Sequence, residues 1–168
     1  MSGVIGYAVD DGVGYFKLGG ELRHDSAAPL EALIERLFEN QPSVRGVVID
    51  LNELSFMDST VIGLLASIAR ALMAHQLPPA TIFSTSPEIN ELLRSLCLDE
   101  VFTLIDHPTD QTANPLQLQN IDACGQCSPD AILKAHEVLI ELNEANRIAF
   151  QPVVDLFRAE IEAHHKET

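Results

Sequence analysis

Residues 45–75, RGVVIDLNELSFMDSTVIGLLASIARALMAH, contain the strand and helix that decide the fold. Residues 45–51 are a β-branched run that is apolar on both faces, which predicts a central strand covered by helices. Asp58 is a good N-cap, and the sequence after it predicts a helix over about residues 59–75. The apolar positions that recur there at helical spacing are Val61, Leu65, Ile68 and Leu72.

Strands are predicted on both sides of this unit. Residues 4–9 and 13–19 form a hairpin around the turn signal Asp10-Asp11-Gly12, and Gly19-Gly20 closes its second strand. Short strands are also expected at residues 81–83 and 101–105.

Two further helices separate these strands. The first is capped by Asp25-Ser26 and ends before Pro42, and the second begins at Ser86-Pro87. The alternation predicts an α/β domain with a mixed β-sheet and helices packed on it, spanning residues 1–106.

The sequence changes character after this domain. Residues 107–128 lack periodicity and are expected to form a linker. Residues 129–168 are predicted to form a C-terminal helical extension that breaks at 148–151, because Pro152 disrupts a helix interior. We expect this extension to fold back on its own domain and to leave the surface around Ser59 open. The alternatives are that it packs on the extension of a second copy, forming a homodimer, or on a partner protein.

Composition excludes several classes of protein. A net charge of −15 argues against nucleic-acid binding and against an anionic membrane surface. The sequence contains no signal peptide and no apolar run long enough to span a membrane. Three cysteines form no disulfide framework, which favours a cytoplasmic location.

Two motifs link the chain to a family. Residues 20–27 read GELRHDSA, and residues 54–65 read LSFMDSTVIGLL. Together, in this element order, they resemble the STAS domain of bacterial anti-sigma factor antagonists. Arg23 stands where that family usually has Asp, and Val61 replaces its first Gly, whereas Gly63 is retained.

The resemblance implies a STAS fold and a partner-switching, non-catalytic protein without a cofactor. In the family, the serine after the motif aspartate is phosphorylated by an anti-sigma factor that is itself a GHKL-type serine kinase. A PPM-type serine phosphatase reverses this step. By position the phosphorylated residue is Ser59. The expected partner-binding residues are Leu22, Arg23, His24, Asp25, Met57, Asp58, Ser59, Thr60, Ile62, Gly63 and Ser67.

The residues themselves support a switch at Ser59. A phosphate there would add about −1.5 to −2 charge at a helix N-terminus, which tolerates anions. Gly63 and Ser67 follow Ser59 on one side of the helix, and their small size permits close approach by another protein. Thr60 is the competing acceptor.

Other functions remain as alternatives. A STAS module without a kinase could act as a structural subunit of a transport or signalling assembly. Cys124 and Cys127 form a CxxC pair that could be the redox centre of an enzyme. We favour the alternative that they are two incidental thiols in a surface loop. No metal site is expected, although His107 or His136 could add a ligand, and Cys97 is interpreted as core filler on a helix.

Overall fold

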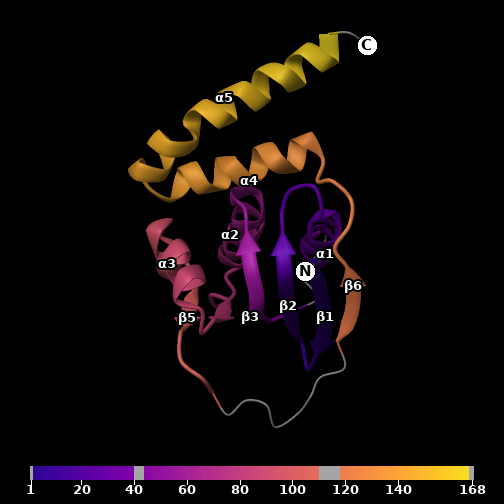
Figure 1. The fold of residues 1–168 in the computed structure, drawn as a ribbon, viewed down its shortest axis with the longest axis vertical. Coiled ribbons are helices and arrows are strands. Elements are labelled where there is room, and N and C mark those ends of the chain that lie inside the picture. Colours follow the sequence, from indigo (N-terminus) through magenta and orange to yellow (C-terminus); the bar gives the residue numbers. More distant parts are fainter. Residues whose placement is uncertain (1, 40–43, 110–117, 167–168) are drawn as a thin grey trace.

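The computed structural model describes residues 2–39, 44–109 and 118–166 and contains one six-stranded sheet (Figure 1). The elements are β1 (Val4–Asp10), β2 (Val13–Leu22), α1 (Ala28–Phe38), β3 (Gly46–Met57), α2 (Ser59–Ala74), β4 (Thr81–Phe83), α3 (Pro87–Ser95), η1 (Leu98–Glu100), β5 (Thr103–Ile105), β6 (Gln119–Asp122), α4 (Pro129–Leu142) and α5 (Glu144–Lys166). In the sheet the strands are ordered β5-β4-β3-β2-β1-β6.

The hairpin and the mixed sheet are confirmed. Asp11 and Gly12 both have positive φ, 48° and 75°, as a two-residue turn between twisted strands requires. β1 is antiparallel to β2, whereas the pairs β2–β3, β3–β4 and β4–β5 are parallel. The order of elements from β1 to β5 is therefore the predicted α/β arrangement.

β2 and β3 are longer than the sequence suggested. β2 continues past Gly20, and β3 continues through residues 52–57, where a loop was expected. Leu22 pairs with Met57 at the end of both strands, after two register shifts, and the Ser55 hydroxyl donates to the Gly20 carbonyl at 3.0 Å. This extension places the two sequence motifs side by side.

The expected cap of α1 is wrong. The N-cap is Ala27, which has no side-chain cap, because the Ser26 hydroxyl is engaged with Arg23 instead, at 3.2 Å from its amide nitrogen. β5 is also shorter than predicted, because it begins at Thr103 and not at residue 101. Cys97 lies outside α3, at the left-handed turn before η1, with φ 61°.

The core lies mainly on one face of the sheet. In β3 the side chains of Val47, Ile49 and Leu51 are buried, while Val48 and Asp50 between them are half-buried. The prediction that this strand is covered on both faces is therefore wrong, because the helices shield one face more fully. The largest fully buried side chains are Phe16, Ile5, Leu18, Leu22, Leu30, Ile49, Leu51, Met57, Ile62, Leu65, Ile68 and Leu72.

The segment predicted as a linker contributes to the sheet. β6 pairs antiparallel with β1, with Ile5 opposite Ile121, so residues 119–122 form an edge strand. Residues 110–117 of this segment lie outside the described residues. β6 then leads into α4.

The C-terminal extension forms two helices, but they break at Asn143. Asn143 is extended, and its side chain accepts from the Asn146 amide at 2.7 Å, which starts α5. Pro152 lies inside α5, so the predicted break at 148–151 is wrong. α4 lies across the end of the sheet at which β2 and β3 finish, and α5 packs on the outer side of α4 (Figure 1). Among the described residues, no helix has both the length and the apolarity to cross a membrane.

Candidate functional site

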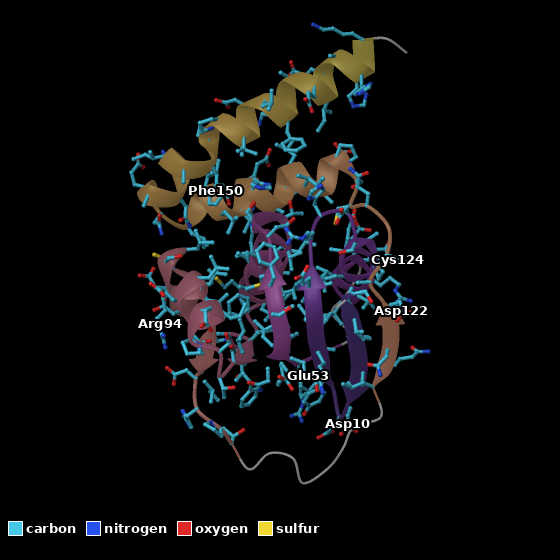
Figure 2. All side chains as sticks on the ribbon, viewed as in Figure 1. Asp10, Glu53, Arg94, Asp122, Cys124 and Phe150 are labelled. Atoms are coloured by element: carbon cyan, nitrogen blue, oxygen red, sulfur yellow. The ribbon has the colours of Figure 1, made fainter. Side chains whose placement is uncertain are left out.

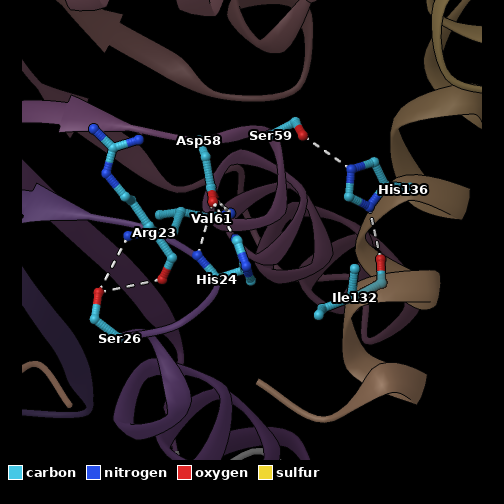
Figure 3. Close-up of polar contacts among 8 residues, drawn as sticks. All are labelled: Arg23, His24, Ser26, Asp58, Ser59, Val61, Ile132 and His136. Carbon is cyan, nitrogen blue, oxygen red and sulfur yellow. Dashed lines mark hydrogen bonds and ion pairs between the residues drawn. The ribbon is translucent and has the colours of Figure 1, made fainter. Parts of the chain in front are cut away.

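Asp58 joins the two motifs. One carboxylate oxygen accepts from the Val61 amide at 3.0 Å and caps α2, as the sequence predicted. The other accepts from the His24 amide at 2.7 Å, and the His24 Nδ1 lies 3.1 Å from it (Figure 3). A single side chain therefore fixes both the start of α2 and the loop after β2.

Ser59 is the first residue of α2 and is half-buried. Thr60, the competing phosphoacceptor, is only 4% exposed. The exposed amides of a helix N-terminus stabilise a negative charge, so a phosphate at this position is compatible with the helix. Of the two hydroxyls, that of Ser59 is the more accessible.

The Ser59 hydroxyl is bonded to the C-terminal extension. Its Oγ lies 2.9 Å from the His136 Nε2, and the His136 Nδ1 lies 2.8 Å from the Ile132 carbonyl oxygen (Figure 3). A carbonyl only accepts, so in the neutral imidazole Nδ1 carries the ring proton and Nε2 accepts the hydroxyl proton of Ser59. His136 is 4% exposed and its ring contacts those of Phe150 and Phe157.

Gly63 lies directly against α4. A methyl group on Gly63 would overlap the Ala135 carbonyl oxygen and come within 2.7 Å of the Ala135 Cβ. From the sequence we interpreted the small size of Gly63 as room for another protein. The contact shows instead that a larger residue there would collide with the chain's own helix.

α2 is enclosed on more than one side. Every residue from 60 to 66 is buried, although only one side of the helix can face the sheet. We interpreted the small residues on this side of α2 as a surface for another protein. Two of them, Ser59 and Gly63, instead contact α4 of the same chain. The expectation that the surface around Ser59 stays open is wrong, whereas the expectation that the extension packs on its own domain is confirmed.

By their exposure, the other expected partner-binding residues divide into three groups. Arg23, His24 and Asp25 are exposed on the loop after β2, and the Arg23 guanidinium lies 4.1 Å from the centre of the Phe56 ring. Asp58 and Ser67 are half-buried. The buried members are Leu22, Met57, Thr60, Ile62 and Gly63.

Three further contacts hold the extension in place. At the start of α4, the Ser128 hydroxyl donates to Glu31 at 2.9 Å. Near its end, Glu141 pairs with Arg70 of α2 at 2.9 Å. At the start of α5, the buried Asn146 side chain donates to the Leu96 carbonyl at 3.0 Å.

His136, Ala135 and Glu31 were not recognised from the sequence as neighbours of this site. His136 was considered only as a metal ligand. The available signal was in α2, whose apolar residues surround the helix rather than forming one stripe, which is typical of a helix buried on all sides. That signal predicts a covering element without naming it.

Cys124 and Cys127 are not joined by a disulfide bond in this structure. Cys124 lies on the connection between β6 and α4 (Figure 2) and is exposed, while Cys127 is buried. Burial, with the negative charges of Glu31 and Asp58, raises the pKa of the Cys127 thiol to about 12, the opposite of an activated thiol. No group of three or more metal-ligating side chains occurs in the described parts of the chain.

Comparison with known proteins identifies the fold. The family model for the STAS domain matches residues 5–112, so the chain belongs to the STAS domain family. No curated protein matches the chain.

Solved structures of anti-sigma factor antagonists are similar to this chain. One from Mycobacterium paratuberculosis is 25% identical with a TM-score of 0.50, and the match covers 64% of this chain and 87% of that one. The Bacillus cell fate determinant SpoIIAA in its phosphorylated form is 24% identical with a TM-score of 0.52, covering 65% and 95%. Unphosphorylated SpoIIAA is 25% identical with a TM-score of 0.48, covering 54% and 81%.

The family match includes Ser59, Asp58 and the loop after β2, but it ends before α4. The Ser59–His136 contact therefore joins the STAS domain to a helix outside the family region. The structure from Mycobacterium paratuberculosis supports the general class of anti-sigma factor antagonist.

Proposed function

We propose that this chain is an anti-sigma factor antagonist of a partner-switching pathway in the cytoplasm. When Ser59 is unphosphorylated, the chain binds an anti-sigma factor that is also a GHKL-type serine kinase. Phosphorylation of Ser59 releases that partner, and a PPM-type phosphatase restores binding. The output is regulation of transcription, and the chain itself is not an enzyme.

The observation that carries this proposal is the placement of Ser59. It follows the capping Asp58 at the first turn of α2, inside the region that matches the STAS family. Phosphate there would put two negative groups next to each other, and a partner covering them would have to desolvate both. Release of the partner is the expected consequence.

The test uses the full chain in its own cells. Mass spectrometry should find phosphate on Ser59 of the wild type and of Ser95→Ala, a control at an exposed serine of α3, but none in Ser59→Ala. Affinity capture with Ser59→Ala should enrich a serine kinase, and Ser59→Asp should enrich less of it. Stable capture of membrane transport subunits without phosphate on Ser59 would support the structural-subunit alternative instead.

A further inference from the structure

The contacts of α4 lie on the surface that the proposed function needs. Ser59 and Gly63 belong to the expected partner-binding surface, and both contact α4, through His136 and Ala135. Ile62 of that surface is 2% exposed. In this closed arrangement a protein partner cannot reach this side of α2.

We propose that α4 is an intramolecular competitor for this surface, so that closed α4 excludes both a bound partner and a phosphate on Ser59. The inference rests on the proposed function, because the phosphate on Ser59 is the switch that it invokes. The loop residues Arg23, His24 and Asp25 stay exposed, so they remain available for a first encounter while α4 is closed.

The bond between Ser59 and His136 explains the exclusion of phosphate. When a kinase transfers a phosphoryl group from ATP, Oγ bonds to the γ-phosphorus, ADP leaves and the hydroxyl proton is lost. Ser59 then has no proton to donate to the His136 Nε2. The phosphate oxygens and Nε2 are all acceptors, because the ring proton is on Nδ1 and is bonded to Ile132.

The surroundings of His136 also disfavour a phosphate on Ser59 in the closed arrangement. The ring is 4% exposed and lies 5.7 Å from the Phe150 ring and 6.3 Å from the Phe157 ring, centre to centre. A phosphate dianion held against this buried ring would lose much of its hydration. Release of α4 restores water to both the phosphate and the imidazole.

The shape of α4 indicates how it can leave without unfolding the domain. α4 and α5 form a hairpin, and the family region ends before them. That region holds most of the core side chains, whereas β6 and the buried α4 residues Ile132 and Leu139 lie outside it. The chain reaches α4 through β6 and the exposed residues 124–126. The Gly125 carbonyl accepts from the Ala28 amide at 3.1 Å and the Cys127 amide donates to the His24 carbonyl at 2.8 Å, so the hairpin would turn after Cys127.

Hydrogen exchange of the full-length chain tests this proposal without a kinase. Four proteins are compared: the wild type, a chain with genetically encoded phosphoserine at position 59, Gly63→Ala, and Gly46→Ala. Gly46 is the matched control, because a methyl group there would meet no atom within 4 Å. The readout is the exchange rate of amides in α4, with amides of β3 as the internal reference.

We expect α4 amides to exchange at least about tenfold faster in the phosphoserine chain and in Gly63→Ala, with β3 still protected. The wild type and Gly46→Ala should keep α4 protected. Unchanged protection of α4 in the phosphoserine chain would overturn the proposal, because phosphate and the closed helix would then coexist. Loss of β3 protection together with α4 in both altered chains would also overturn it, because α4 would then be an integral part of the domain.

The outcome is separable from that of the proposed function. If Ser59 carries no phosphate in cells while phosphoserine still releases α4, the proposed pathway fails and the competition between phosphate and α4 stands. If Ser59 is phosphorylated in cells but α4 stays protected, the pathway stands and the competition fails.

Discussion

The Ser59 hydroxyl donates to the Nε2 of His136 at 2.9 Å, although 77 positions separate the two residues in the chain. The bond joins the first turn of α2 to the middle of α4. It ties the predicted phosphoacceptor to a helix outside the family region.

A double-mutant cycle of Ser59→Ala and His136→Phe measures this bond. Phenylalanine retains an aromatic ring between Phe150 and Phe157 but cannot accept from Ser59. The two residues should show a coupling free energy of about 0.5 to 1.5 kcal/mol in urea unfolding, the usual contribution of one hydrogen bond. Losses of stability that add without coupling would contradict the assignment of the bond.

Asp58 should matter more than an ordinary N-cap. Asp58→Ala removes the acceptor for Val61 and the acceptor for the His24 amide, so unfolding should become easier by roughly 2 kcal/mol. Asp58→Asn is the matched control, since its carbonyl oxygen can still cap Val61, and it should cost less. Equal losses for the two variants in thermal or urea unfolding would show that the cap contributes little.

Local signals predicted most of the domain. The turn at Asp11-Gly12, the caps Asp58 and Ser86, and the periodicity of α2 each depend on residues close in the chain. Together they gave the mixed sheet and placed Ser59 at a helix start. These features could be predicted because each signal acts within one element or one turn.

The errors involve contacts between distant parts of the chain. β6 is a polar edge strand, residues 119–122, and only its pairing with β1 identifies it. Asn143 ends α4 by extending and capping α5, while Pro152 is accommodated within α5. The covering of Ser59 depends on the direction in which α4 folds back, and no periodicity specifies that direction.

Gly20 should tolerate no side chain. Its φ is +71°, and a methyl group there would lie 2.5 Å from the Ser2 carbonyl oxygen. Gly20→Ala should cost roughly 2 kcal/mol and lower the melting temperature by roughly 4 to 8 °C. Gly46→Ala, in open space, should change it much less. Similar melting temperatures for the two variants would contradict the strained geometry at Gly20.

Cys127 should make stability depend on alkaline pH. Burial first, and then the charges of Glu31 and Asp58, raise the pKa of its thiol from 9.0 to about 12. Above the pKa of the unfolded state, the unfolded chain loses the thiol proton while the folded chain keeps it, so the unfolded chain binds fewer protons. The contribution of Cys127 to stability is therefore complete below about pH 9 and falls as pH rises toward about 12.

The measurement is the free energy of urea unfolding of the wild type, Cys127→Ala and Cys124→Ser at about pH 8 and about pH 10. In the wild type, the Cys127 thiol should account for a loss of about 1.4 kcal/mol between these two pH values. Cys124 is exposed, so Cys124→Ser should lose as much stability over this interval as the wild type. Cys127→Ala should lose about 1.4 kcal/mol less, because it has no thiol to ionise on unfolding. The difference between variants cancels the titration of lysine and tyrosine residues that they share. An equal loss in all three proteins would mean that the Cys127 thiol ionises as readily in the folded chain as in the unfolded one.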